Sequence, residues 1–165
     1  MRRVWFLLVL VLLLTACGSV PVFETVGDQW QEVPPVREPR EVLLELPGGV
    51  AVPTMETEDG QRVYICDGYE ISVQIQRSGN LAETVRAVTG CEMDALTVLD
   101  RVENGFQRHD LAWSAAGENG DRVGRAAILD DGCYHYAVCV LADADRAKDA
   151  EQAIQTVLCN IALGV

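Results

Sequence analysis

The fold is decided by the stretch Arg62-Val63-Tyr64-Ile65-Cys66-Asp67-Gly68-Tyr69-Glu70-Ile71-Ser72-Val73-Gln74-Ile75-Gln76. Asp67-Gly68 separates two runs that are rich in β-branched and aromatic residues, and both turn residues tolerate positive φ, so the pattern predicts a tight β-hairpin. Every second residue from Tyr69 to Ile75 is apolar, which places these side chains on one face of a strand. We therefore predict an antiparallel pair with one buried face.

The period changes from two to about 3.6 directly after this hairpin. Asn80 can cap a helix, and Glu83 stands where a capping-box partner reaches back. Gly90 is a suitable helix stop. The apolar stripe between them consists of Leu81, Val85 and Val88. This segment is therefore predicted to form a short helix.

Further strand-like runs lie on both sides of the predicted hairpin and helix. The runs at 96–102, 106–116, 123–129 and 134–141 are separated by turn signals rich in Asn, Asp and Gly, which predicts an antiparallel meander. Two shorter runs, 42–46 and 50–54, precede the hairpin and could add strands.

The chain ends in a second helical pattern, for which Asp143 or Asp145 can serve as N-cap. Its stripe follows the i, i+3, i+4, i+7 spacing and consists of Ala150, Ala153, Ile154, Val157, Leu158 and Ile161. The expected fold class is therefore α+β, with a central antiparallel sheet of about six strands flanked by two helices. Residues 41–165 form one globular domain in this interpretation.

The run from Gly124 to Ala137, followed by the last helix, resembles small lipoproteins of Gram-positive gut bacteria, which look similar to the PsbP-like fold. The resemblance covers roughly residues 41–163. It implies a central antiparallel sheet flanked by helices, and a binding or accessory domain that is not an enzyme.

The N-terminus resembles a bacterial lipoprotein signal peptide. A basic start, Met1-Arg2-Arg3, precedes 11 apolar residues from Val4 to Leu14, and Leu14-Thr15-Ala16-Cys17 resembles a lipobox. The apolar run is too short for a spanning helix, which needs about 20 residues. The resemblance implies cleavage before Cys17 and a lipid anchor on its thiol. A secretory signal that is cleaved without lipidation is the alternative.

The expected organisation therefore has three parts. Residues 1–16 are the signal peptide, residues 17–40 are a lipidated N-terminus and a proline-rich tether, and the domain follows at residue 41. Prolines favour an extended, semi-rigid arm. The anchored protein would lie on the extracytoplasmic face of the cell membrane, in an envelope whose Gram type stays open.

The charge balance limits the partners. The chain has 13 basic and 25 acidic side chains, and loss of Arg2 and Arg3 with the signal peptide leaves 11 basic ones and a formal net charge of −14. Nucleic-acid binding needs clustered Lys and Arg, so we expect no nucleic-acid partner. Anionic lipid headgroups should also repel this surface.

Five cysteines follow Cys17, and an odd number leaves at least one unpaired. The helix after the hairpin should return to the end where Cys66 lies, which makes a Cys66–Cys91 disulfide possible. A Cys133–Cys159 disulfide is a second possibility, although Cys159 lies opposite the apolar stripe of its helix. Cys139 is expected to be a small buried apolar residue.

Three functional hypotheses remain. The first is a lipid-anchored binding or accessory domain without catalytic, cofactor-binding or metal-binding residues, whose partner is a protein or small molecule of the envelope. The second is a thiol-based redox or metal-dependent enzyme, for which Cys133 and His135 would be same-face neighbours. The third is a structural spacer. No nucleophile elbow, phosphate loop or HExxH motif occurs, and Asp130-Asp131-Gly132 is better explained as a turn than as a calcium site.

Overall fold

The computed structural model describes residues 23–26, 29–32, 37–48, 50, 52–58, 60–116 and 120–164. The predicted signal peptide and Cys17 lie outside these ranges. The chain divides between Pro35 and Val36 into two units. The first contains an antiparallel hairpin of β1 (Phe23–Val26) and β2 (Gln29–Glu32), which the sequence analysis did not predict.

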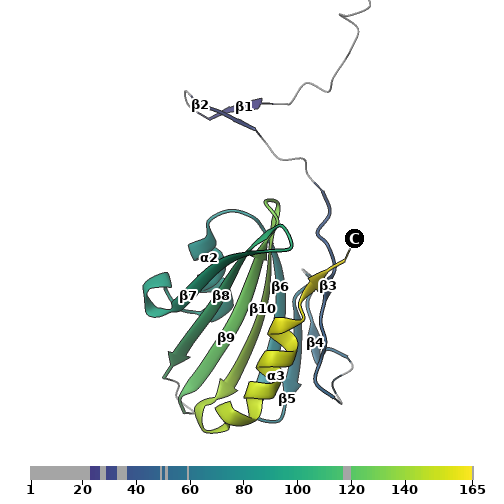
Figure 1. The fold of residues 1–165 in the computed structure, drawn as a ribbon, viewed down its shortest axis with the longest axis vertical. Coiled ribbons are helices and arrows are strands. Elements are labelled where there is room, and N and C mark those ends of the chain that lie inside the picture. Colours follow the sequence, from purple (N-terminus) through teal and green to yellow (C-terminus); the bar gives the residue numbers. More distant parts are fainter. Residues whose placement is uncertain are drawn as a thin grey trace, which may run out of the picture. The chain divides into compact units, whose positions relative to one another are not determined.

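The second unit is built on a seven-stranded sheet with the order β4-β5-β6-β10-β9-β8-β7 (Figure 1). All neighbouring strands are antiparallel. The strands are β4 (Met55–Glu56), β5 (Arg62–Cys66), β6 (Tyr69–Arg77), β7 (Thr97–Glu103), β8 (Phe106–Ala115), β9 (Arg122–Asp130) and β10 (Tyr134–Asp143). With one helix on each face, described below, the predicted α+β class is confirmed.

The predicted hairpin and meander are both present. Strands β5 and β6 pair up to Cys66 and Tyr69, and Gly68 between them adopts φ +83°. Strands β7 to β10 follow one another as a meander. The sequence analysis did not predict the pairing of β6 with β10, which joins the hairpin to the meander through nine residue pairs.

The segment before the hairpin contains less strand than predicted. The run 42–46 forms only β3 (Val42–Leu43), which pairs with β11 (Ala162–Leu163) in a separate small sheet. In the run 50–54, residues 50 and 52–54 lie outside any strand. Pro47 and Pro53 lack the N–H group that a ladder requires, which explains the short pairing here.

The first helix forms as predicted. In α2 (Leu81–Thr89), the Asn80 side chain accepts a hydrogen bond from the Ala82 amide at 3.0 Å. Gly90 ends the helix in the left-handed region, and its N–H group donates to the Arg86 carbonyl at 2.8 Å. A short 3-10 helix, η1 (Met93–Ala95), then leads into β7.

The last helix, α3 (Ala147–Cys159), forms as expected, but its predicted cap is wrong. A 3-10 turn, η2 (Ala144–Arg146), precedes it, and neither Asp143 at the start of η2 nor the residue before α3 caps with its side chain. The Ala147 N–H group instead donates to the Ala144 carbonyl, because the 3-10 turn satisfies the first backbone donors. None of the helices in the described ranges is long and apolar enough to span a bilayer.

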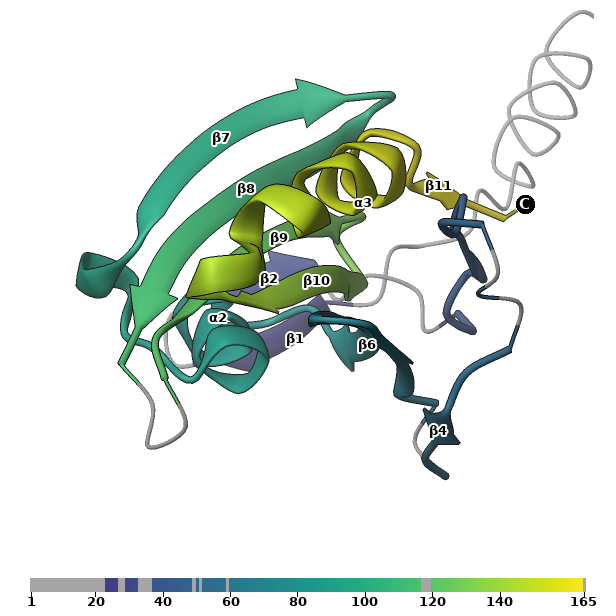
Figure 2. The ribbon, with the colours of Figure 1, turned by 90° about the horizontal axis from the view of Figure 1, so that it is seen from below.

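The two helices cover opposite faces of the sheet (Figure 2). Val157 and Leu158 of α3 pack in one cluster with Tyr136 and Val138 of β10. Val85 of α2 packs in a second cluster with alternate β10 residues, Ala137 and Cys139, and with Trp113. We call these the α3 cluster and the α2 cluster. The outer strands β7 and β8 curve towards the side of α3 in Figure 2.

Gly124 is required by the packing of the α2 cluster. It pairs with Trp113 across β8 and β9, and a Cβ atom at this position would overlap the indole ring. Gly124→Ala should therefore lower the free energy of unfolding by about 1–3 kcal/mol, which denaturant titration measures. Gly79→Ala is the matched control and should change stability little, because the nearest atom to its Cβ is the Arg77 carbonyl oxygen at 4.0 Å. Equal stability of the two variants would contradict this packing.

Candidate functional site

An open groove lies between α3 and the outer strands β7, β8 and β9. Its volume is about 710 Å³. The polar side chains that line it are Thr97, Ser114, Arg125, Lys148, Glu151 and Gln155. Small apolar residues, including Ala95 and Ala112, leave room between the sheet and the helix.

Strand alternation explains how a charged residue reaches this groove. Ala126 and Ile128 of β9 belong to the α2 cluster, whereas Ala127 and Leu129 belong to the α3 cluster. Arg125 has the parity of the second pair, so it lies on the α3 face, where only Ala112 stands opposite it on β8. Lys148 approaches the same groove from the first turn of α3.

Arg125 and Lys148 differ from the other cationic side chains of the described residues. Neither of these two side chains makes a hydrogen bond, an ion pair or an aromatic ring contact within the part of the chain that the structure describes. The arginines that do have such a partner are Arg37, Arg40, Arg62, Arg77, Arg86, Arg101, Arg108, Arg122 and Arg146. The two unpaired cations of the described residues therefore line the same groove.

Arg108 illustrates how the other cations are used. Its side chain is 3% exposed, and its Nη2 donates to the Leu158 carbonyl at 2.7 Å, near the end of α3. Glu103 and Asp110 neutralise its charge at 3.1 and 2.9 Å. A cation at a helix C-terminus is stabilising, so Arg108 fixes α3 to β8 and is not available to a ligand.

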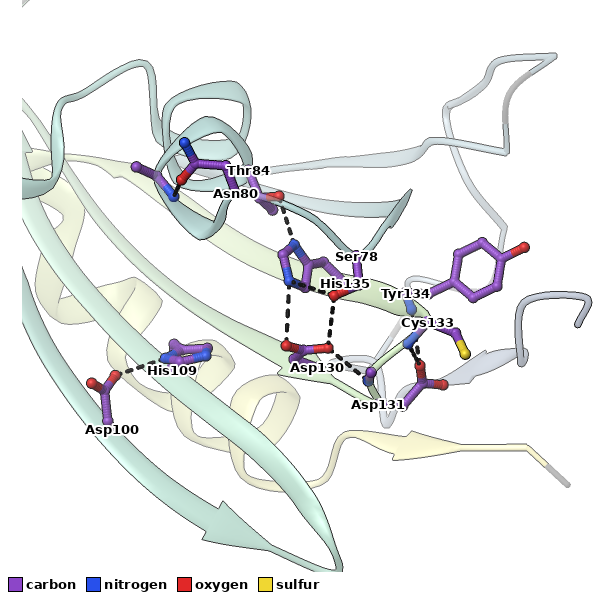
Figure 3. A network of polar contacts seen from close by, with 12 residues as sticks. Ser78, Asn80, Thr84, Asp100, His109, Asp130, Asp131, Cys133, Tyr134 and His135 are labelled. Carbon is purple, nitrogen blue, oxygen red and sulfur yellow. Dashed lines mark hydrogen bonds and ion pairs between the residues drawn. The ribbon is translucent and has the colours of Figure 1, made fainter. Parts of the chain in front are cut away.

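A second polar cluster surrounds His135, which is 1% exposed (Figure 3). Its Nδ1 lies 2.7 Å from the Thr84 Oγ1, and its Nε2 lies 3.4 Å from the Ser78 Oγ and 3.5 Å from the Asp130 Oδ2. A catalytic triad needs the acid and the nucleophile on opposite ring nitrogens. Here Asp130 and Ser78 share one nitrogen, and the buried Thr84 occupies the other. The cluster joins α2 to the β9–β10 turn.

The expectation that Cys133 and His135 are neighbours on one strand face is wrong. Strand β10 begins only at Tyr134, so Cys133 lies in the preceding turn and strand alternation does not extend to it. Its side chain packs against the α3 cluster, whereas His135 contacts Thr84 of α2. The other histidine, His109, has its Nδ1 2.7 Å from the Asp100 Oδ1 on the edge strand β7 (Figure 3).

Asp131 anchors the start of the second unit. Its carboxylate accepts hydrogen bonds from the amides of Cys133 and Tyr134, both at 2.9 Å, and from the Tyr136 hydroxyl at 2.8 Å, and it pairs with Arg37. The Arg40 amide donates to the same Tyr136 hydroxyl at 3.0 Å. Residues 37–40, which the sequence placed in the tether, therefore contact the domain.

These partners also set the proton affinity of Asp131. Burial acts to raise the pKa of its carboxyl group, but the hydrogen bonds from the Cys133 and Tyr134 amides and the Tyr136 hydroxyl, together with Arg37, outweigh burial. The pKa of Asp131 is therefore lowered from its ordinary value. Asp130-Asp131-Gly132 forms the β9–β10 turn, as expected.

Neither predicted disulfide, Cys66–Cys91 or Cys133–Cys159, forms among the residues that the structure describes. Cys66 packs against the α3 cluster and Cys91 against the α2 cluster, so the sheet lies between them. Cys159 is exposed at the end of α3, while Cys133 is partly buried. The topological argument therefore failed to give the correct face of the sheet.

Cys139 is buried, as predicted. Its relative exposure is 4%, and burial raises the pKa of its thiol to about 12. A thiolate is therefore strongly disfavoured at this position.

No protein-family model and no curated protein sequence matches the chain. Among solved structures, LpqN, which is involved in cell envelope biogenesis of Mycobacterium tuberculosis, is similar over 78% of this chain and 87% of its own, with a TM-score of 0.54 and 11% identity. A protein of unknown function from Pseudomonas aeruginosa, PA94, is 11% identical over 83% of this chain and 95% of its own, with a TM-score of 0.40, and supports no argument. The LpqN likeness shows a shared fold, and the PsbP-like resemblance stays a prediction.

The sequence analysis assigned no role to the groove residues. Arg125 lies in the predicted strand 123–129 and in the run that resembles PsbP-like lipoproteins, and neither pattern indicates a function for it. The sequence did contain one indication of the groove. Among the alternate residues of β9 that face α3, Val123, Ala127 and Leu129 are apolar, whereas Arg125 is charged. A charged residue in such a series marks a place where the helix does not cover the strand.

Asp131→Asn should lower the free energy of unfolding by about 2 kcal/mol at neutral pH, because hydrogen bonds to a charged, buried carboxylate are lost. The folded-state pKa of Asp131 is below its unfolded value, so the carboxylate contributes fully above about pH 4 and its contribution is lost as the pH falls through the folded pKa. Urea unfolding on both sides of this pH should show the variant and the wild type converging in acid. Asp67→Asn is the control, since Asp67 is 93% exposed.

Alkylation by N-ethylmaleimide under native conditions should modify Cys159 first and leave Cys139 unmodified until the protein unfolds. The reaction requires an accessible thiol that can lose its proton. Cys139 is buried, and the pKa of its thiol is raised. Peptide mapping without reduction measures both. A Cys66–Cys91 linked peptide from freshly purified protein would contradict the placement of these residues on opposite faces.

Proposed function

We propose that this protein is a lipid-anchored, extracytoplasmic accessory domain of the cell envelope, and that it binds its ligand in the groove between α3 and strands β7–β9. The observation that carries the proposal is the location of Arg125 and Lys148, the two unpaired cations of the described residues, in one groove. Cations without partners on an acidic protein attract an anionic group to that place.

Two further observations support the location and the role. The lipobox-like segment Leu14–Cys17 supports a lipid anchor on the outer side of the membrane. LpqN, which is involved in cell envelope biogenesis, has a similar fold. Both are consistent with an accessory role in the envelope.

The groove chemistry favours binding over catalysis. Proton transfer near neutral pH usually needs a group such as histidine within reach of the substrate. Neither His109 nor His135 is among the groove residues, which supply cations, hydroxyls, an amide and one carboxylate. The raised pKa of Cys139 also argues against thiolate chemistry at that residue.

Photo-crosslinking in cells tests this proposal. Replacement of Gln155 in the groove by p-benzoylphenylalanine should produce a crosslinked adduct with an envelope component after irradiation. The adduct should weaken when Arg125→Gln and Lys148→Gln are added. The same photoreactive residue at Glu83, which is exposed on α2 on the opposite face, should give no such adduct.

A further arm tests the anchor. Cys17→Ser should move the protein from the membrane fraction to a soluble fraction and reduce the adduct, because the groove is no longer held at the membrane. Crosslinking of equal yield from Gln155 and Glu83, or from the protein with and without the two groove cations, would contradict a ligand-binding groove and favour a structural spacer.

A further inference from the structure

We propose that the groove recognises a hydroxylated monoanion, namely a sugar or polyol that carries one phosphodiester or one carboxylate group. This inference rests on the proposed function, because it names the ligand class of the same groove. It follows from the charges that face the groove, from the donors and acceptors beside them, and from the volume.

The groove charges favour a single negative charge. Arg125 lies on the sheet wall and Lys148 on the helix wall, while Glu151 follows Lys148 by one turn on α3. The groove therefore has a formal charge of +1. A dianion would meet the Glu151 carboxylate, and a neutral sugar would leave both cations without a counterion, so a monoanion matches best.

The two cations differ in what they can recognise. The Arg125 guanidinium presents a planar pair of donors that suits the two oxygens of a phosphodiester or a carboxylate. Lys148 adds a point charge from the opposite wall. Because Lys148 lies in the first turn of α3, the positive end of the helix dipole reinforces its attraction for an anion.

The remaining polar residues suit hydroxyl groups. Thr97 and Ser114 offer hydroxyls that both donate and accept, Gln155 offers an amide, and the Glu151 carboxylate accepts from ligand hydroxyls. These are the groups that bind sugars and polyols. The volume of about 710 Å³ lies within the range of small-molecule sites, which is roughly 300–1,000 Å³.

The rest of the protein surface excludes larger polyanions. The chain has 25 acidic and 13 basic side chains, and every arginine in the described ranges other than Arg125 is engaged by a protein partner. A nucleic acid or an anionic bilayer would need many cations at once. One local anion needs only the pair at the groove.

Lys148 provides a direct probe, because it is the only lysine of the chain. Reductive methylation with ¹³C-formaldehyde keeps its charge and gives one dimethyl-lysine NMR signal in the full-length protein purified in detergent. A free N-terminal amine would also be methylated. Its signal remains in the Lys148→Arg variant, which distinguishes it from the signal of Lys148. The signal of Lys148 then reports on ligands that enter the groove.

We expect glycerophosphoglycerol, a phosphodiester monoanion, or glucuronate, a carboxylate monoanion, to shift this signal saturably at constant ionic strength. Glucose, which is neutral, should not shift the Lys148 signal. Glycerol 3-phosphate, a dianion, should bind more weakly than whichever of the two monoanions binds more tightly. Comparison of the two affinities shows whether the groove prefers a phosphodiester or a carboxylate. Arg125→Gln should weaken binding about tenfold, the loss of one charge-assisted contact. Arg86→Gln, an exposed arginine of α2, should leave affinity unchanged.

The inference is overturned if neither monoanion gives a saturable shift, if glucose binds as tightly as they do, or if Arg125→Gln binds with wild-type affinity. These failures differ from failure of the proposed function. An adduct from the photoreactive residue at 155 together with no response to the monoanions would retain the groove as a binding site and reject this ligand class.

Discussion

The domain is organised around strand β10, which is buried on both faces. Residues 134–140 of this strand are all buried, so each face of the sheet needs a helix to exclude water. The α3 cluster forms around Tyr136, Val138 and Val140, and the α2 cluster forms around Ala137 and Cys139. Pairing of β6 and β9 on either side of β10 completes its backbone hydrogen bonds. The centre of the sheet therefore determines where both helices lie.

The same constraint produces the groove. Helix α3 packs against the centre of the sheet, but the sheet continues outward through β8 to β7, most of whose residues are exposed. The outer strands curve towards α3 without being covered by it (Figure 2). Arg108 fixes the C-terminal end of α3 to β8 through the Leu158 carbonyl. The N-terminal half of α3, with Lys148 and Glu151, is left facing open sheet.

Electrostatics distinguishes this groove from the other polar clusters. In the His135 cluster and in the Asp131 cluster, the polar side chains find partners within their own cluster. The first cluster connects α2 to the end of β9, and the second connects the β9–β10 turn to residues 37–40. Such satisfied networks stabilise a structure, because the polar groups would otherwise be buried without partners. In the groove, Arg125 and Lys148 remain open to solvent and to a ligand. The contrast between satisfied and unsatisfied charge supports assigning the function to the groove.

The local elements follow from short-range patterns in the sequence. The Asp-Gly and Asn-Gly turns, the period of two in β6, and the Asn80 and Gly90 helix ends depend on residues that are close in the chain, so the hairpin, the meander and both helices could be predicted. Prolines 47 and 53 limited the strands before the hairpin, an effect that the apolar pattern concealed.

Which elements meet depends on tertiary packing. The β6–β10 pairing joins residues at least 57 positions apart, and the face that each helix covers depends on its packing against strands outside its own segment, which no local pattern encodes. For this reason the predicted Cys66–Cys91 disulfide and the expected shared face of Cys133 and His135 were wrong, and the groove was not predicted. The meeting of Arg125 and Lys148 is likewise a product of packing, since a strand and a helix bring together two charges that lie 23 positions apart in the sequence.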